Sequence, residues 1–139
     1  FVAFKEITGI EAKSDEQGGF SLTLDERIPF RIELDESREW IHLIMDLGDV
    51  PRGPYRIAFF KAALQENGKE YPRYGNLAYS QEVRKVILFE KVYIYDQTKE
   101  SLEELLIPFM KKGIAWSKDL FSGSIPTVTS GGSLNPFSV

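Results

Sequence analysis

The chain has 139 residues, of which 42% are hydrophobic and 27% charged, and its formal net charge is −4. This length suffices for one domain with its own hydrophobic core. The acidic balance argues against a nucleic-acid-binding protein, which needs clustered Lys and Arg. The absence of cysteine excludes disulfides, thiolate catalysis and zinc–thiolate sites. No apolar run approaches the roughly 20 residues that span a bilayer, so we expect no membrane insertion.

The first third of the chain predicts a helix followed by three strands. Phe1, Phe4 and Ile7 recur at helical spacing before Gly9 and predict the last turns of a helix. Three later segments alternate apolar and polar side chains and are joined by short polar turns: "FSLTLD", "IPFRIEL" and "WIHLIMDLG". They predict an antiparallel meander. Pro29 cannot donate a ladder hydrogen bond, so the second strand is expected to be an edge strand or to start beyond the proline.

The second half predicts a helix, two paired strands and a long final helix. Pro51 and Pro54 indicate the start of a middle helix that runs to about Asn67, with Gly68 in the left-handed position after it. "NLAYSQ" and "RKVILFEKVYIY" predict the two strands. Thr98 predicts the N-cap of the final helix. An apolar stripe at spacings of three and four then continues along it: Leu102, Leu105, Leu106, Phe109, Met110, Gly113, Trp116 and Leu120.

The predicted order of elements is α-β-β-β-α-β-β-α. Strands that cluster between helices indicate an α+β fold, with an antiparallel sheet of about five strands flanked by three helices. We expect residues 1–121 to form a single domain. Residues 122–139 are rich in Ser, Gly and Thr and predict a flexible tail.

A search for catalytic or ligand-binding residues gives one weak candidate set. His42 is the only histidine, and Asp46 and Asp49 bracket Leu47-Gly48, where a carboxylate pair could bind a cation or act as acid and base. The interpretation that we favour is that both aspartates are strand-end and turn residues, where Asp is common. No nucleotide-binding, GxSxG or HExxH motif is present. We therefore expect no catalytic residue, no metal site and no cofactor.

The middle helix has an unusual amount of apolar surface. Its apolar side chains spread over most of the helix circumference: Tyr55, Ile57, Phe59, Phe60, Ala63 and Leu64. A helix that is apolar over so wide an arc is covered on more than one side. The protein's own sheet can cover one side, and either the final helix or a partner molecule covers the other.

Taken together, these segments resemble a class I type III secretion chaperone of the CesT/SycE-like family. The likeness extends from Phe1 to Phe121 and is carried by the following stretches: "FSLTLDERIPFRIEL", "MDLGDVP", "AALQENG", "GNLAYS", "KVILFEKV" and "SLEELLIPFMKKGIAWSKDL". The resemblance implies a twisted antiparallel sheet with three helices, in a homodimer of the bacterial cytoplasm. It also implies a non-enzymatic chaperone that binds the extended N-terminal segment of a secreted effector and keeps it soluble and competent for secretion.

The resemblance implies two binding surfaces. A homodimer interface is expected on the middle helix and the fourth strand: Tyr55, Phe59, Phe60, Ala63, Leu64, Leu77 and Tyr79. An effector groove is expected on the N-terminal helix and the first two strands: Phe1, Phe4, Phe20, Leu22, Ile28, Phe30 and Ile32. Several of the groove residues, Leu22 and Ile32 among them, could instead be core under the final helix. Two other functions stay open: a regulatory or adaptor module of the same fold, and a small enzyme that acts through Asp46, Asp49 and His42.

Overall fold

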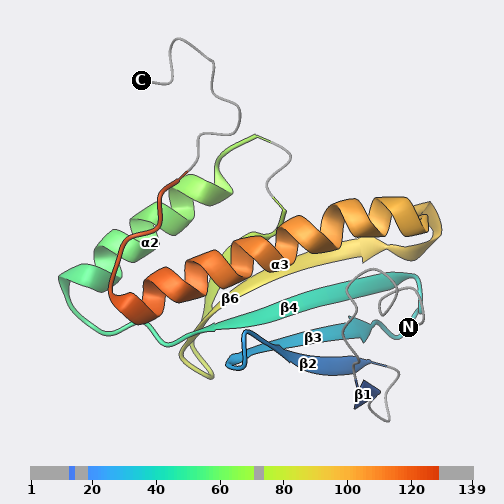
Figure 1. The fold of residues 1–139 in the computed structure, drawn as a ribbon, viewed down its shortest axis with the longest axis horizontal. Helices are drawn as coiled ribbons and strands as arrows, with labels where there is room; N and C mark the ends of the chain where they lie inside the picture. The colour runs from blue at the N-terminus through green and yellow to red at the C-terminus, as the bar shows by residue number, and fades with distance from the viewer. Residues whose placement is uncertain (1–12, 15–18, 71–73, 129–139) are drawn as a thin grey trace.

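The fold is an antiparallel sheet with helices packed against it (Figure 1). The computed structural model describes residues 13–14, 19–70 and 74–128. The strands form one six-stranded sheet in the order β1-β2-β3-β4-β6-β5. Their bounds are β1 Lys13–Ser14, β2 Phe20–Leu24, β3 Ile28–Leu34, β4 Trp40–Gly48, β5 Asn76–Ser80 and β6 Lys85–Tyr93. The predicted α+β fold is confirmed, and the strand beyond the expected five is the two-residue β1.

Two α-helices lie in the described part of the chain, α2 (Pro54–Asn67) and α3 (Lys99–Ser122), with a short 3-10 turn, η1 (Ile94–Asp96), before α3. The predicted N-terminal helix falls outside the described residues. In Figure 1, α3 runs along one face of the sheet, and α2 lies toward the end of α3 that carries its C-terminus. Helix α2 packs against β5, and its Phe59 contacts Trp116 of α3.

Strands β2, β3 and β4 form the predicted meander. Phe20 lies opposite Ile32, and Phe30 lies opposite Met45, so alternate side chains of all three strands point toward α3. The predicted edge position of the strand that contains Pro29 is wrong, because β3 lies between β2 and β4. The sheet accommodates the proline because pairing with β4 begins at Phe30, one residue beyond it.

The helix ends follow local sequence signals with one exception. Pro54 is at the start of α2 as predicted, and Thr98 caps α3 in a capping box with Ser101. The left-handed conformation predicted for Gly68 is wrong, since its φ is −84°. Its N–H still bonds back to Leu64 and Gln65, so the chain leaves α2 by a further right-handed turn. Gly123, the residue after α3, has the left-handed conformation, with φ 74°.

The core lies between the sheet and α3. Fully buried side chains from β3, β4, β6 and α3 meet there, among them Phe30, Met45, Leu88 and Phe109. Gly113 allows α3 to approach the sheet closely, because a Cβ at this position would collide with the Met45 sulfur. Leu106, Phe109, Trp116 and Leu120 of the predicted apolar stripe are all buried, which confirms that this stripe faces the core.

An ion network joins α2, α3 and the start of β5. Glu66 is 2% exposed, and its Oε2 atom lies 2.8 Å from Lys69 Nζ and 2.9 Å from Lys112 Nζ. Lys112 also donates to the Gly75 carbonyl oxygen at 3.2 Å. A buried carboxylate needs such partners because its desolvation is costly. The network holds the C-terminal end of α2 in one position relative to α3 and β5.

The first part of the predicted tail packs on the domain. Ser122 belongs to α3, and the following residues to Val128 run back along α2 (Figure 1). The Tyr55 hydroxyl donates to the Asp119 carbonyl at 3.3 Å and to the Ser124 carbonyl at 2.8 Å, and Pro126 is buried. Residues 129–139 lie outside the described part, and the domain boundary after residue 121 stays a prediction.

Candidate protein-binding surfaces

Helix α2 divides its apolar side chains between two directions. Phe59 is 0% exposed and packs edge-on against Trp116 of α3, with ring centroids 5.6 Å apart. Tyr55 lies on the same side, 5.9 Å from the Phe59 ring. In contrast, Ile57 and Leu64 are 73% and 72% exposed. The final helix therefore covers one side of α2, and the other side presents large apolar side chains to solvent.

The environment of Tyr55 keeps its hydroxyl group protonated. Burial raises the pKa of the Tyr55 phenol, and the negative charge of Asp119 raises it further. The single proton of the neutral phenol is then shared between the Asp119 carbonyl in α3 and the Ser124 carbonyl just after it. This side of α2 is thus occupied by contacts within the protomer.

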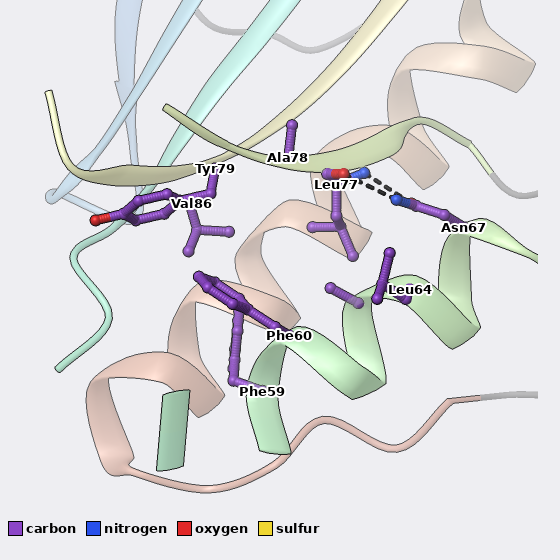
Figure 2. Close-up of a pocket in the computed structure, with 9 residues that line it drawn as sticks. Phe59, Phe60, Leu64, Asn67, Leu77, Ala78, Tyr79 and Val86 are labelled. Atoms are coloured by element: carbon purple, nitrogen blue, oxygen red, sulfur yellow. Dashed lines mark hydrogen bonds between the residues drawn. The ribbon is translucent and has the colours of Figure 1, made fainter. Parts of the chain in front are cut away.

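An apolar groove lies between α2 and β5 (Figure 2). It is called the α2/β5 groove below, and its lining residues are Phe59, Phe60, Ala63, Leu64, Asn67, Leu77, Ala78, Tyr79 and Val86. The Phe60 and Tyr79 rings meet across it with centroids 5.3 Å apart. The Arg56 guanidinium group lies 5.5 Å from the Tyr79 ring centroid, at a distance where a cation and an aromatic face attract one another. The groove opens beside the exposed Leu64 side chain.

The side-chain amide of Asn67 lies at one end of this groove. Asn67, the last residue of α2, donates from Nδ2 to the Leu77 carbonyl oxygen at 2.8 Å, and its Oδ1 accepts from the Leu77 N–H, also at 2.8 Å. Figure 2 shows both bonds at the end of the groove. With these backbone groups bonded, the groove presents mainly apolar atoms to a partner.

The amino-acid sequence matches the Tir chaperone protein (CesT) family over residues 3–117. The chain belongs to this family. Comparison with curated proteins gives no significant match.

Solved structures of similar fold agree with the CesT assignment. A chain of the heterodimeric ExoU–SpcU complex from the type III secretion system of Pseudomonas aeruginosa matches with a TM-score of 0.65 and 17% identity, over 86% of this chain and 95% of that one. A chain of the HopA1–SchA chaperone–effector complex gives 0.60 and 14%, over 83% and 88%. The Yersinia pestis type III secretion chaperone SycH with a stable fragment of YscM2 gives 0.56 and 16%, over 80% and 91%. At these identities the likeness shows a shared fold.

The residues predicted for the dimer interface of this CesT-family chain fall into two groups. Phe60, Ala63, Leu64, Leu77 and Tyr79 all line the α2/β5 groove. The other two, Phe59 and Tyr55, face α3, although Phe59 also reaches the groove floor. The interface assignment itself stays a prediction.

The residues predicted for the dimer interface did not include Ile57. Ile57 lines a shallow apolar hollow on α2 together with Phe60, Lys61, Leu64 and Gln65. The spacing of Ile57, Phe60 and Leu64, three and then four residues apart, is the signal that could have identified this stripe.

The residues predicted for the effector groove of this CesT-family chain are mostly core residues in the protomer. Phe30 is 0% exposed, and its ring lies 5.7 Å from that of Phe109. Phe20, Ile28 and Ile32 are also buried, whereas Leu22 is only partly buried. Phe1 and Phe4 lie outside the described residues. The effector-binding assignment therefore stays a prediction, with Leu22 as its most accessible described member.

The structure does not bring the acidic residues and His42 into one site. Asp46 accepts a hydrogen bond from the Gly48 N–H at 3.0 Å, where the pairing of β4 with β6 shifts register. His42 shares a face of β4 with Asp46 but lies four residues away, about 13 Å along the strand. Asp49 is exposed in the loop before α2. Among the described residues there is no group of three His, Asp or Glu side chains placed to hold a metal ion, and no helix there is long and apolar enough to cross a membrane.

Proposed function

We propose that this protein is a non-enzymatic chaperone that binds the extended N-terminal segment of a secreted effector and keeps it soluble and competent for type III secretion. The observation that carries the proposal is the family match over residues 3–117. The similar structures include a chaperone–effector complex and a type III secretion chaperone, which supports the same function. The chaperone would act in the bacterial cytoplasm, before the effector is exported.

The physical requirements of such a function are simple. An effector segment that is not folded has no core of its own, so it gains stability by burying apolar side chains on the chaperone. Extended segments bind along strands, where alternate side chains enter apolar pockets. The acidic charge of the chaperone helps to keep the unoccupied protein soluble.

The active form that we propose is a homodimer built on α2 and β5. Ile57 and Leu64 are largely exposed in the protomer, and the α2/β5 groove lies beside Leu64. Packing of the same apolar stripe from two copies around a two-fold axis would cover both side chains. A stable interface of this kind buries at least about 1,000 Å² in total.

We assign effector binding to the side of the sheet formed by β2 and β3. Leu22 is a partly buried apolar residue of this side, and Thr23 next to it is exposed on the opposite face of the same strand. The two positions form a matched pair, because neighbouring strand residues point in opposite directions. A contact through Leu22 can therefore be separated from a general disturbance of β2.

The first experiment is capture of the effector by the tagged protein, followed by mass spectrometry and binding measurements on the wild type, Leu22→Ala and Thr23→Ala. The expected partner is a secreted protein that binds through its N-terminal segment. Leu22→Ala should lower its affinity by about tenfold, as expected for loss of about 1.5 kcal/mol of apolar burial. Thr23→Ala should leave the affinity unchanged.

Two outcomes would contradict this assignment. If no secreted protein binds, or if the partner binds through its folded domain, the proposed function is wrong. If Leu22→Ala lowers the melting temperature while the affinity is kept, Leu22 is a core residue and the effector binds elsewhere.

A further expectation is that the protein has no catalytic residue. Asp46→Asn, Asp49→Asn and His42→Gln should each bind the effector with wild-type affinity, because His42 lies about 13 Å from Asp46 along β4 and none of the three side chains lines the α2/β5 groove. The check is isothermal titration of the effector segment with each variant, together with a thermal-shift screen against divalent metals and nucleotides. A metal or nucleotide that stabilises the wild type but not one of the variants would favour the enzyme interpretation.

A further inference from the structure

Strand β5 is the outermost strand at one edge of the sheet. An edge strand carries N–H and C=O groups that can pair with a strand from another chain, and two copies of one edge can pair with each other antiparallel. β5 has five residues, Asn76–Ser80, and it lies beside the α2/β5 groove. A second copy of the chain could therefore pair with the β5 backbone or pack its apolar side chains into the α2/β5 groove.

Asn67 occupies the edge of β5 in the way that a neighbouring strand would. Its side-chain amide bonds both backbone groups of Leu77, with each donor–acceptor distance 2.8 Å. A strand residue on a paired neighbour exchanges the same two kinds of hydrogen bond with the residue opposite. The amide of Asn67 therefore substitutes for one residue of an added strand.

Hydrogen-bonded and non-hydrogen-bonded pairs alternate along an antiparallel ladder, and this alternation shows which β5 residues direct their backbone groups away from β6. Because Leu77 directs its N–H and C=O to Asn67, Leu77 and Leu88 form a pair without mutual hydrogen bonds. Tyr79, two residues further along, lies opposite Val86 in the same kind of pair, so its backbone groups also point away from β6. Within β5 only Leu77 and Tyr79 direct these groups outward, and Asn67 takes up those of Leu77.

Contacts at the end of α2 and at the start of β5 hold Asn67 in position. Glu66 precedes it in the chain and is buried between Lys69 and Lys112. Lys112 also bonds the Gly75 carbonyl, just before β5 begins. The same ion network thus holds the end of α2 and the start of β5, which keeps the Asn67 amide in register with Leu77.

We propose that Asn67 closes the β5 edge against the β5 edge of a second copy of this chain. Two copies can then meet through apolar side chains of α2 and β5, but the sheet does not continue from one copy into the next. The alternative is that Asn67 only ties α2 to β5 inside the protomer. That role would affect stability and would not change how copies associate.

The test compares the full-length wild type with Asn67→Ala and Asn67→Asp by sedimentation velocity over a range of concentrations, and by hydrogen exchange of the β5 amides. Asn67→Ala removes both bonds and leaves an uncharged edge. It should form species larger than those of the wild type as concentration rises, and the Tyr79 amide should become at least tenfold more protected in those species. Asn67→Asp cannot donate to the Leu77 carbonyl, and its charge opposes strand pairing, so it should keep the wild-type size.

The outcomes against the proposal are equally specific. If the Leu77 amide exchanges freely in the wild type, Asn67 does not close the edge. If Asn67→Ala accelerates Leu77 exchange but keeps the wild-type size at every concentration, Asn67 is only a link between α2 and β5. Asn67→Ser takes the place of Asn67→Ala if the alanine variant does not melt cooperatively. Effector binding is not among the readouts, so the result is independent of the proposed chaperone function.

Discussion

Replacing Leu64 by glutamate should convert the protein from a dimer into a folded monomer. Leu64 is 72% exposed in the protomer, so a charge at this position costs the isolated fold little. In the proposed dimer the same side chain is buried against the second copy. A carboxylate that loses its hydration there without a partner should weaken association by about 3 kcal/mol or more, roughly a hundredfold in the dissociation constant.

Light scattering coupled to size-exclusion chromatography at micromolar concentration measures this change. Tyr95→Glu is the matched control, because Tyr95 is also 72% exposed but lies in η1, outside the α2/β5 groove. Phe60→Glu would be less informative, since Phe60 is half-buried and packs against Tyr79 within the protomer. If the Leu64→Glu variant remains dimeric, the interface lies elsewhere. If the wild type is monomeric, the proposed dimer does not exist.

Replacing Phe109 by alanine should have the largest effect on the folded state. Phe109 is 0% exposed, packs against Phe30 and lies so near Gly75 that a Cβ there would be 2.9 Å from its ring. One ring thus fills the space among α3, β3 and the chain before β5. Truncation of a buried phenylalanine leaves a cavity and costs about 3–5 kcal/mol, which for a domain of this size lowers the melting temperature by roughly 10–20 °C.

Urea denaturation of the wild type, Phe109→Ala and Phe121→Ala tests this expectation. Phe121 is on the same helix but is 66% exposed, and its described partner is the Arg27 guanidinium group 4.3 Å from the ring centroid. Its removal should cost about 1 kcal/mol or less. Similar midpoints for the two variants would mean that Phe109 does not carry the core contact described above.

Several features of the fold could be predicted from the sequence because they depend on neighbours a few residues away. The alternation in "FSLTL" and "IPFRIEL" predicts strands since side chains of a strand point to opposite faces in turn. Thr98 and the stripe of Leu106, Phe109, Trp116 and Leu120 predict the start and the buried face of α3 for the same reason. The combination of segments also indicated the family, which the match over residues 3–117 confirms.

The burial of the residues predicted for the two candidate surfaces could not be derived from the sequence, because burial depends on contacts between distant segments. Residues of similar type on α2 have opposite surroundings: Phe59 is enclosed by Trp116 of α3, whereas Ile57 has no such cover and is 73% exposed. The sequence also leaves open whether the apolar residues of β3 are buried or exposed. Phe30 could have been a binding residue or core until its contact with Phe109 was known.

The sequence by itself determined strands β2 to β6, the starts of α2 and α3, the acidic charge and the family, since each depends on composition or on local spacing. Only the tertiary structure decided that β3 is internal, since strand order depends on which segments pair and not on their own patterns. The same holds for Gly68, whose conformation is right-handed, with its N–H bonded to the Leu64 and Gln65 carbonyl oxygens. It holds most clearly for Asn67, whose side chain bonds Leu77, ten residues away in sequence, across the edge of the sheet. No local pattern marks that asparagine, because its role exists only once α2 lies beside β5.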